Sequence, residues 1–189
     1  MKYTNYFEQV ALVNFAKYLP LVGDCDLKFL QVGVFRGDAS IYIAENFLSN
    51  PNSKLHDVDL WGGTTDPSHN ALDFHEIEKD YEIRLSKYID SRKVVKHKMS
   101  SNDFFDFNQE DFDFIYIDGD HSMLSVLTDG LNSFRALKPG GILAFDDYGG
   151  ALEYPIHMRP GPAIDSLLVA WSGNYKVLEK SYQVWLQKK

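Results

Sequence analysis

The sequence of 189 residues is poor in cysteine and has no long apolar run. Its single cysteine, Cys25, cannot form an internal disulfide, so we expect a reducing, cytoplasmic setting. No apolar run approaches the roughly 18 residues of a membrane helix, and the N-terminus lacks the basic-then-apolar layout of a signal peptide. Sequence repeats are missing too, which excludes a solenoid. These absences favour a globular protein, and we expect one domain over residues 1–189.

Basic residues are also scarce. The chain has 19 Lys and Arg against 27 Asp and Glu, a formal net charge of -8. Binding to nucleic acid needs clustered Lys and Arg that neutralise phosphates, so the composition argues against a nucleic-acid partner. The densest basic stretch, residues 91–98, is typical of a strand with solvated flanks. The acidic excess therefore reflects either plain solubility or carboxylates gathered at a cation site.

What the sequence does contain is a regular alternation of strand-like and helix-like segments. We expect strands at 27–34, 54–60, 93–98, 112–118 and 140–146, then a closing pair at 175–180 and 182–187. Helices are expected between them, at 38–48, 71–88, near Asp103, at 122–137 and at 163–171, after an opening amphipathic helix. Such alternation predicts a parallel sheet covered by helices on both faces. The expected fold is α/β, a Rossmann-like three-layer sandwich with a mostly parallel seven-stranded sheet and a C-terminal antiparallel hairpin.

Carboxylates end three of the expected parallel strands. Asp59 ends the second strand, Asp118 ends the fourth, and Asp146 and Asp147 end the fifth. The carboxyl ends of parallel strands meet along one edge of a sheet, which is where ligands bind in open α/β folds. Carboxylates that converge raise one another's pKa, and a hard divalent cation such as Mg²⁺ removes that conflict. The alternative is a solvated acidic rim beside the pocket.

Two glycines, Gly33 and Gly37, lie in the turn after the first strand with the spacing G-x-x-x-G. A dinucleotide-binding turn reads G-x-G-x-x-G, and its middle glycine makes room for a pyrophosphate. Phe35 and Arg36 take up that space, so we expect a ligand without phosphates. Asp59 follows Gly37 by 22 residues (59 − 37), a separation at which a carboxylate accepts hydrogen bonds from both ribose hydroxyls. An ordinary turn and a solvated aspartate are the alternatives.

In this order, the segments resemble the class I S-adenosylmethionine-dependent methyltransferases. The resemblance covers roughly residues 29–187 and is carried by FLQVGVFRGDAS, DVDLW, FDFIYIDGDHS, LKPGGILAFDDY and YKVLEKSYQVWL. It is nearest to the small O-methyltransferases that act on sugars of macrolide antibiotics, which have a similar IDGDH and DDY. The resemblance implies S-adenosylmethionine as cofactor. Its methionine part would lie on the turn of Gly33 and Gly37, its ribose on Asp59, and its adenine beside Ser100 and Ser101.

The same resemblance implies a metal. In those enzymes, the acid that ends the fourth strand and two residues that end the fifth bind Mg²⁺, and the matching positions are Asp118, Asp146 and Asp147. Asp118 is also assigned to the cofactor site and to catalysis. His121 has a pKa range that suits a general base, although it could equally be a structural histidine at the start of a helix. One departure is Gln31, where the family usually has an acid, and we expect Gln31→Glu to tighten cofactor binding.

The sequence thus predicts methyl transfer from S-adenosylmethionine to a hydroxyl of a small-molecule acceptor, sugar-containing molecules included. Mg²⁺ or a similar divalent cation would orient and acidify the hydroxyl. Two alternatives are a methyltransferase that needs no metal and a non-catalytic metabolite-binding module on the same fold. Residues 62–75 and 148–163 are expected to form the walls of the acceptor site. The identity of the acceptor and a homo-oligomeric state stay open, and no membrane partner is expected.

Overall fold

The protein, seen in a computed structural model that describes residues 5–63 and 71–189, is built around a seven-stranded sheet. The strands are β1 (Lys28–Val32), β2 (Lys54–Asp59), β3 (Val94–Lys98), β4 (Phe112–Ile117), β5 (Leu137–Phe145), β6 (Tyr175–Lys180) and β7 (Val184–Lys188). Their order across the sheet is β3-β2-β1-β4-β5-β7-β6. Strands β1 to β5 run parallel, whereas β7 is antiparallel to both β5 and β6. The predicted sheet with its C-terminal antiparallel hairpin is confirmed.

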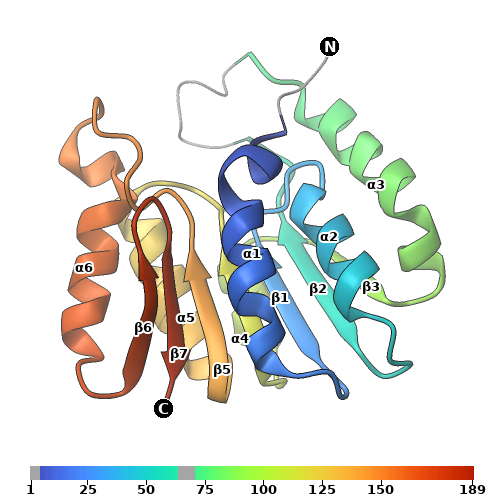
Figure 1. The fold of residues 1–189 in the computed structure, drawn as a ribbon. Coiled ribbons are helices and arrows are strands. Elements are labelled where there is room, and N and C mark those ends of the chain that lie inside the picture. Colours follow the sequence, from blue (N-terminus) through green and yellow to red (C-terminus); the bar gives the residue numbers. More distant parts are fainter. Residues whose placement is uncertain (1–4, 64–70) are drawn as a thin grey trace.

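Helices cover both faces of the sheet and complete a three-layer sandwich (Figure 1). One face carries the π-helix η1 (Phe7–Ala11), α1 (Leu12–Tyr18), the 3₁₀ turn η2 (Leu19–Val22), α2 (Asp38–Phe47) and α3 (Phe74–Asp90). The other face carries α4 (Ser101–Phe107), α5 (Met123–Ala136), the 3₁₀ turn η4 (Ile156–Met158) and α6 (Pro160–Ala170). Each face buries its own apolar cluster. Phe114 of β4 belongs to the first cluster and Ile115 to the second, which is why this strand is apolar at successive positions.

The start of β5 differs from the sequence prediction. The sequence predicted a helix to residue 137 and a strand only from residue 140, but α5 ends at Ala136 and Leu137 already pairs with Phe112 of β4. The pairing shifts its register between Phe112 and Phe114, and Gly140 has a φ of +81°. Proline and glycine therefore produce an irregular first half of a strand, because the missing N–H and the left-handed backbone are tolerated at such a shift.

The register of the sheet brings four strand ends to one edge, at the top in Figure 1. Val32 of β1 pairs with Val58 of β2 and with Ile117 of β4, and Ile117 pairs with Phe145 of β5. The chain therefore leaves these strands at similar heights. The residues that follow or end them are Gly33, Asp59, Asp118 and Asp146.

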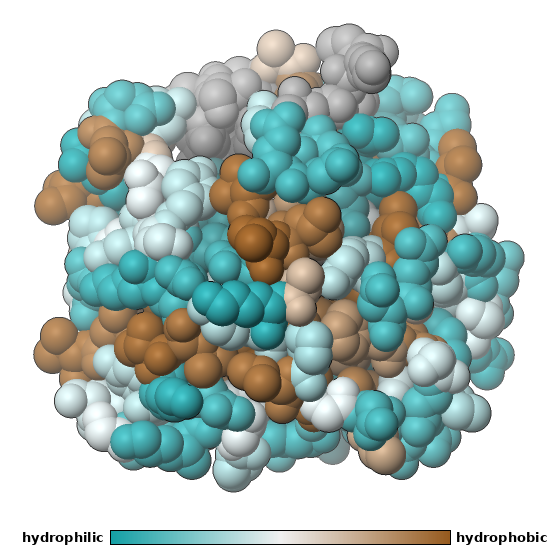
Figure 2. All heavy atoms as spheres, in the orientation of Figure 1, coloured by the Kyte–Doolittle hydropathy of each residue, from teal (hydrophilic) through white to brown (hydrophobic). Residues whose placement is uncertain are grey.

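The surface of the molecule mixes polar and apolar residues. Figure 2 shows separate hydrophobic patches among hydrophilic side chains on the face that carries α1. Exposed apolar residues include Val13 of α1 and Val177 of β6. Within residues 5–63 and 71–189, no helix is both long and apolar enough to cross a membrane.

Candidate active site

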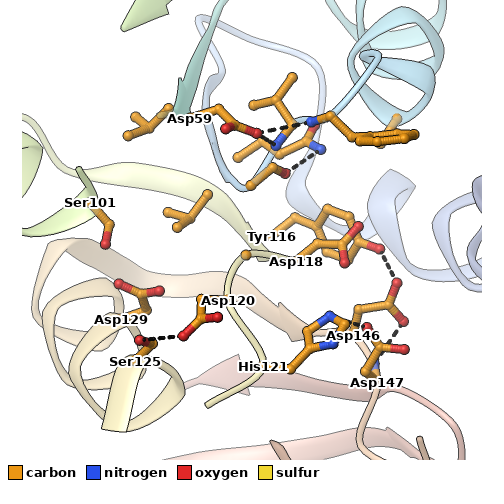
Figure 3. A pocket seen from close by; sticks show the side chains of 18 of the residues that line it. Asp59, Ser101, Tyr116, Asp118, Asp120, His121, Ser125, Asp129, Asp146 and Asp147 are labelled. Atoms are coloured by element: carbon orange, nitrogen blue, oxygen red, sulfur yellow. Dashed lines mark hydrogen bonds and ion pairs between the residues drawn. The ribbon is translucent and has the colours of Figure 1, made fainter. Parts of the chain in front are cut away.

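A pocket of about 710 Å³ opens at the carboxyl edge of the parallel strands. This volume is typical of sites that enclose a small molecule. The pocket is lined by the ends of β1, β2, β4 and β5, by the loops that follow them, and by parts of η1 and α5. Figure 3 shows its polar side chains, with Asp59 on one side, Ser101 and Asp129 on a second, and His121, Asp146 and Asp147 on a third.

Gly33 shapes the turn after β1. Its φ is +81°, and a Cβ at this position would collide with the carbonyl oxygen of Asp118 and lie 2.5 Å from Cα of Gly119. The turn after β1 and the turn after β4 therefore touch backbone to backbone, which only glycine permits. The Gly33 amide also donates to the carbonyl of Val58 at 2.9 Å. Gly33 lines the pocket, but the close approach that requires a glycine is an approach of protein backbone.

Gly37 has a packing role. It precedes α2 with a φ of +76°, and a Cβ there would collide with Leu85 and lie 2.8 Å from the Tyr81 ring of α3. Gly37 is not among the lining residues in the part of the chain that the structure describes. A role for Gly37 in binding the cofactor stays a prediction, and the structure supplies a separate reason for the glycine.

Asp59 lines the pocket with its carboxylate tied to backbone amides. Oδ2 accepts from the amides of Val34 at 2.7 Å and Phe35 at 3.0 Å, and Oδ1 accepts from Trp61 at 2.7 Å. These bonds hold the turns after β1 and β2 against each other. A carboxylate has about four acceptor sites, so about one remains on Asp59, at Oδ1, for a ribose hydroxyl.

Gln31 is 2% exposed, and both ends of its amide are bonded. Nε2 donates to the carbonyl of Gly33 and Oε1 accepts from the hydroxyl of Ser40, each at 3.0 Å. A glutamate here would lose the donor to Gly33 and would place a buried negative charge beside a carbonyl oxygen. The structure therefore gives a physical reason to reverse the expectation that Gln31→Glu tightens cofactor binding.

The two serines after β3 line the pocket as the sequence predicts, with different local roles. Ser100 caps α4, because its hydroxyl accepts from the Asp103 amide at 3.1 Å and donates to the Asp103 carboxylate at 2.6 Å. Ser101 lies beside Asp129 of α5. Burial raises the pKa of Asp129 to about 6, against the hydrogen bond from Ser101, which lowers it. Sequence reasoning missed Asp129, although its position three residues after the apolar Val126 already placed it on the buried face of α5.

Asp118, His121 and Asp147 meet at the end of the pocket beyond β4 and β5. Ligand-type atoms of these three side chains all lie within 4.8 Å of one another. Nε2 of His121 lies 2.9 Å from Oδ2 of Asp147, and the hydroxyl of Tyr182 donates to Oδ1 of Asp147 at 2.5 Å. Since α5 begins only at Met123, a loop and not a helical turn brings His121 beside Asp118. We call these three residues the Asp–His–Asp cluster.

Asp146 is engaged elsewhere (Figure 3). Its Oδ2 accepts from the hydroxyl of Tyr116 at 2.6 Å, and its Oδ1 accepts from Nε2 of Gln183 at 3.0 Å and from the amide of Asp147 at 2.9 Å. The sequence predicted that Asp118, Asp146 and Asp147 converge on one point. In the structure, the group within ligand distance contains His121 in the place of Asp146.

Negative charge is concentrated in the pocket. Burial and the charges of Asp146 and Asp147 raise the pKa of Asp118 well above its usual value, and burial together with Asp147 raises the pKa of Asp146. Among the lining residues within 5–63 and 71–189, eight are carboxylic acids and none is Lys or Arg. The lining therefore favours a cationic ligand over an anionic one.

Among the residues that the structure describes, the expected walls of the acceptor site contribute few lining residues. Gly63 and Phe74 line the pocket from the first predicted wall, and Glu153 lines it from the second. His69, part of the first wall in the sequence prediction, lies outside the described residues. Tyr6, next to η1, is a lining residue that sequence reasoning missed.

Residues 30–148 match a family model described as a methyltransferase domain, and this match spans more than half of the chain. The chain belongs to this methyltransferase family. No curated protein matches the chain in sequence.

Several solved structures share the fold at low sequence identity. An rRNA methylase from Streptococcus thermophilus matches with a TM-score of 0.64 and 12% identity, over 91% of this chain and 92% of the other. An O-methyltransferase from Bacillus cereus in complex with S-adenosylhomocysteine matches with 0.62 and 14%, over 100% and 93%. The N-methyltransferase NodS from Bradyrhizobium japonicum WM9 matches with 0.64 and 15%, over 97% of both chains. This methyltransferase therefore has the Rossmann-like fold of its structural neighbours.

Proposed function

We propose that this methyltransferase transfers a methyl group from S-adenosylmethionine to a hydroxyl of a small-molecule acceptor, with a divalent cation at the Asp–His–Asp cluster. One observation carries the proposal. The cluster lies at the end of a pocket that also contains the Gly33 turn and Asp59, so a donor and an acceptor could meet beside it. The Bacillus cereus O-methyltransferase was solved with S-adenosylhomocysteine, which supports the choice of cofactor.

The donor end of the pocket supplies binding and orientation. S-adenosylmethionine, when bound, supplies a methyl group on a positively charged sulfur. Asp59, held by three backbone amides, would accept one ribose hydroxyl, and the turn at Gly33 would carry the methionine part. Ser100 and Ser101 lie on the side where the adenine would bind. The acidic lining favours the positively charged donor over its neutral product.

The Asp–His–Asp cluster has suitable chemistry for a divalent cation. Carboxylate oxygens suit Mg²⁺ and Mn²⁺, and an imidazole extends the choice to Fe²⁺ and Zn²⁺. Burial and the charges of Asp146 and Asp147 raise the pKa of Asp118, and a cation bound here would offset those charges. A bound cation would lower the pKa of the acceptor hydroxyl.

The same side chains can also act without a cation, which supports a metal-independent methyltransferase as the second candidate. If Nε2 of His121 donates to Asp147, Nδ1 is the ring nitrogen that can accept a proton from the acceptor. The hydrogen bond from Tyr182 orients the Asp147 carboxylate, and the carboxylate in turn orients the imidazole. General-base catalysis of this kind contributes about 10²–10⁴-fold to a rate.

A nucleic-acid acceptor has little support. Phosphates would approach a lining whose described residues include eight carboxylic acids and no Lys or Arg. The neighbour from Streptococcus thermophilus is an rRNA methylase, but a likeness at 12% identity concerns the fold alone. The non-catalytic alternative rested on Gln31, and the bonding of its amide within the fold gives that residue a structural explanation.

The test is methyl transfer from labelled S-adenosylmethionine to a panel of hydroxyl and amine acceptors. We expect transfer to a hydroxyl, loss of transfer in EDTA and recovery with Mg²⁺ or Mn²⁺. Asp118→Asn should lose most activity. Asp113→Asn is the matched control, because Asp113 lies at the opposite end of β4 from the pocket. Its carboxylate accepts hydrogen bonds from the Lys28 amide and from Lys138. Full activity in EDTA would select the metal-independent candidate, and transfer only to amines would refute hydroxyl methylation.

A further inference from the structure

A chain of buried hydrogen bonds runs behind the pocket, from Asp57 of β2 to the Gly33 turn. The hydroxyl of Tyr81 donates to Oδ2 of Asp57 at 2.9 Å. The Ser40 hydroxyl lies against the same carboxyl group and donates to Oε1 of Gln31 at 3.0 Å. Nε2 of Gln31 then donates to the carbonyl of Gly33, also at 3.0 Å. Asp57, Ser40 and Tyr81 are 0% exposed, and none of them is among the described lining residues of the pocket.

The Gly33 carbonyl determines which group donates and which accepts in each of these hydrogen bonds. A carbonyl oxygen only accepts, so Gln31 must turn Nε2 to Gly33 and Oε1 to Ser40. The single hydrogen of the Ser40 hydroxyl is then used on Gln31, and Ser40 can only accept from Asp57. Oδ1 of Asp57 is buried and has no hydrogen-bond partner among the residues that the structure describes. A proton on Oδ1 meets both needs, because it supplies a donor for Ser40 while Oδ2 still accepts from Tyr81.

We propose that Asp57 is a positioning residue for the methyl donor, and that its protonated form holds Ser40 and Gln31 in the orientation that fixes the Gly33 carbonyl. The inference rests on the proposed cofactor site at Gly33. When Asp57 loses its proton, the Ser40 hydrogen turns to the carboxylate and no longer holds Oε1 of Gln31. An amide that turns over in response sets an oxygen against the Gly33 carbonyl, which loosens the turn that carries the methionine part.

The surroundings of Asp57 place its ionisation in the neutral range. Burial raises the pKa of Asp57 to about 7, the hydrogen bond from Tyr81 lowers it, and the charge of Asp59 on the same strand raises it. The titratable group that faces Asp57 from α3 is Tyr81. The neighbouring cation on β3, Lys96, is paired with Glu78 and Glu82.

The test is the affinity for S-adenosylhomocysteine, measured by titration calorimetry with the full chain at roughly pH 6 and pH 8.5. The Asp57→Asn variant keeps a donor for Ser40 and an acceptor for Tyr81 at every pH, so its affinity should hold at the higher pH. The affinity of the parent should fall by about tenfold relative to that variant, which corresponds to a one-unit rise of the Asp57 pKa on binding. Asp118 and Asp129 at the pocket also have raised pKa values, so the readout is the ratio of parent to variant affinity at each pH.

Two further variants make the test specific. Ser40→Ala interrupts the series of hydrogen bonds and leaves Asp57 in place. This variant should bind S-adenosylhomocysteine weakly at both pH values, without the extra pH dependence of the parent. Asp113→Asn, at the far end of β4, should follow the parent. Equal pH profiles for the parent and Asp57→Asn would overturn the proposal.

Failure of the parent to bind at either pH would refute the cofactor site itself. Thermal unfolding then tests the buried hydrogen bonds from Asp57 to Gly33 independently of the cofactor. A carboxyl group whose pKa is raised in the folded state contributes stability to the protein at low pH. This contribution is lost as pH rises from about 4 to about 7. The stability of the parent relative to Asp57→Asn should therefore decline over that window. A constant difference would show that Asp57 carries no proton and would overturn the inference.

Discussion

Nε2 of His121 lies 2.9 Å from Oδ2 of Asp147, although α5 and β5 separate the two residues in the sequence. The contact exists because β4 and β5 are neighbours in the sheet and end together, with Ile117 paired to Phe145. Topology thus places an imidazole and a carboxylate side by side at the end of the pocket.

Manganese binding distinguishes His121 from Asp146 as a metal ligand. His121→Ala should weaken Mn²⁺ binding by at least about tenfold, since changes even outside the ligand set cost 10–100-fold in metal sites. Asp146→Asn should weaken Mn²⁺ binding less than His121→Ala does, because the Asp146 carboxylate is engaged by Tyr116 and Gln183. The measurement is titration of free Mn²⁺ by electron paramagnetic resonance. A larger loss in Asp146→Asn than in His121→Ala would restore Asp146 to the ligand set.

Gly33→Ala and Gly140→Ala form a matched pair, since both glycines have a φ of +81°. Gly140 has open space around a Cβ, so its substitution should cost only the left-handed backbone, about 1–2 kcal/mol. At Gly33 the Cβ also meets the Asp118 carbonyl, and crowding should add about 1–3 kcal/mol. Urea unfolding measures both. Equal losses would mean that the turns after β1 and β4 separate easily.

The sheet and its edge were predictable from the sequence because strand ends follow from apolar runs and turn residues. Parallel pairing then forces Asp59, Asp118 and Asp146 to one edge. The direction of each side chain was not predictable. Asp146 turns to Tyr116 and Gln183, and Gln183 lies 37 residues further along the chain.

Asp129 shows a second limit of sequence reasoning. A carboxylate on a helix is most often solvated, and its burial here depends on packing of α5 beside Ser101. Gln31 is similar. Its neutral amide looks like a departure from the family, and only the contacts with Ser40 and Gly33 explain why an amide with both a donor and an acceptor fits this position.

Gln31→Glu should weaken S-adenosylhomocysteine binding and lower stability at neutral pH, by about 1–3 kcal/mol for the lost donor and the buried charge. Gln187→Glu is the matched control, because Gln187 also donates to a glycine carbonyl, that of Gly140, in an exposed hydrogen bond. The control should change stability little. Calorimetry and urea unfolding provide both readouts, and tighter binding in Gln31→Glu would reinstate the expectation drawn from the sequence.

A partly buried histidine pair should make stability depend on pH. Nδ1 of His56 lies 3.1 Å from Nε2 of His97, and burial together with His97 lowers the pKa of His56 from 6.5 to about 4. A base whose folded pKa is lowered contributes full stability above its unfolded pKa. Stability is therefore lost as pH falls from about 6.5 to about 4, by roughly 3 kcal/mol. Urea midpoints across this window should fall less steeply in His56→Phe, and parallel curves would contradict the assignment.

A crystal structure with S-adenosylhomocysteine and Mn²⁺, using the anomalous signal of manganese, tests the proposed methyl-transfer site most directly. We predict the ribose on Asp59, the sulfur toward the Asp–His–Asp cluster, and an anomalous peak about 2 Å from ligand atoms of Asp118, His121 and Asp147. An occupied cofactor pocket without manganese at the cluster would contradict the metal-assisted mechanism. S-adenosylhomocysteine bound away from Gly33 and Asp59 would contradict the proposed site as a whole.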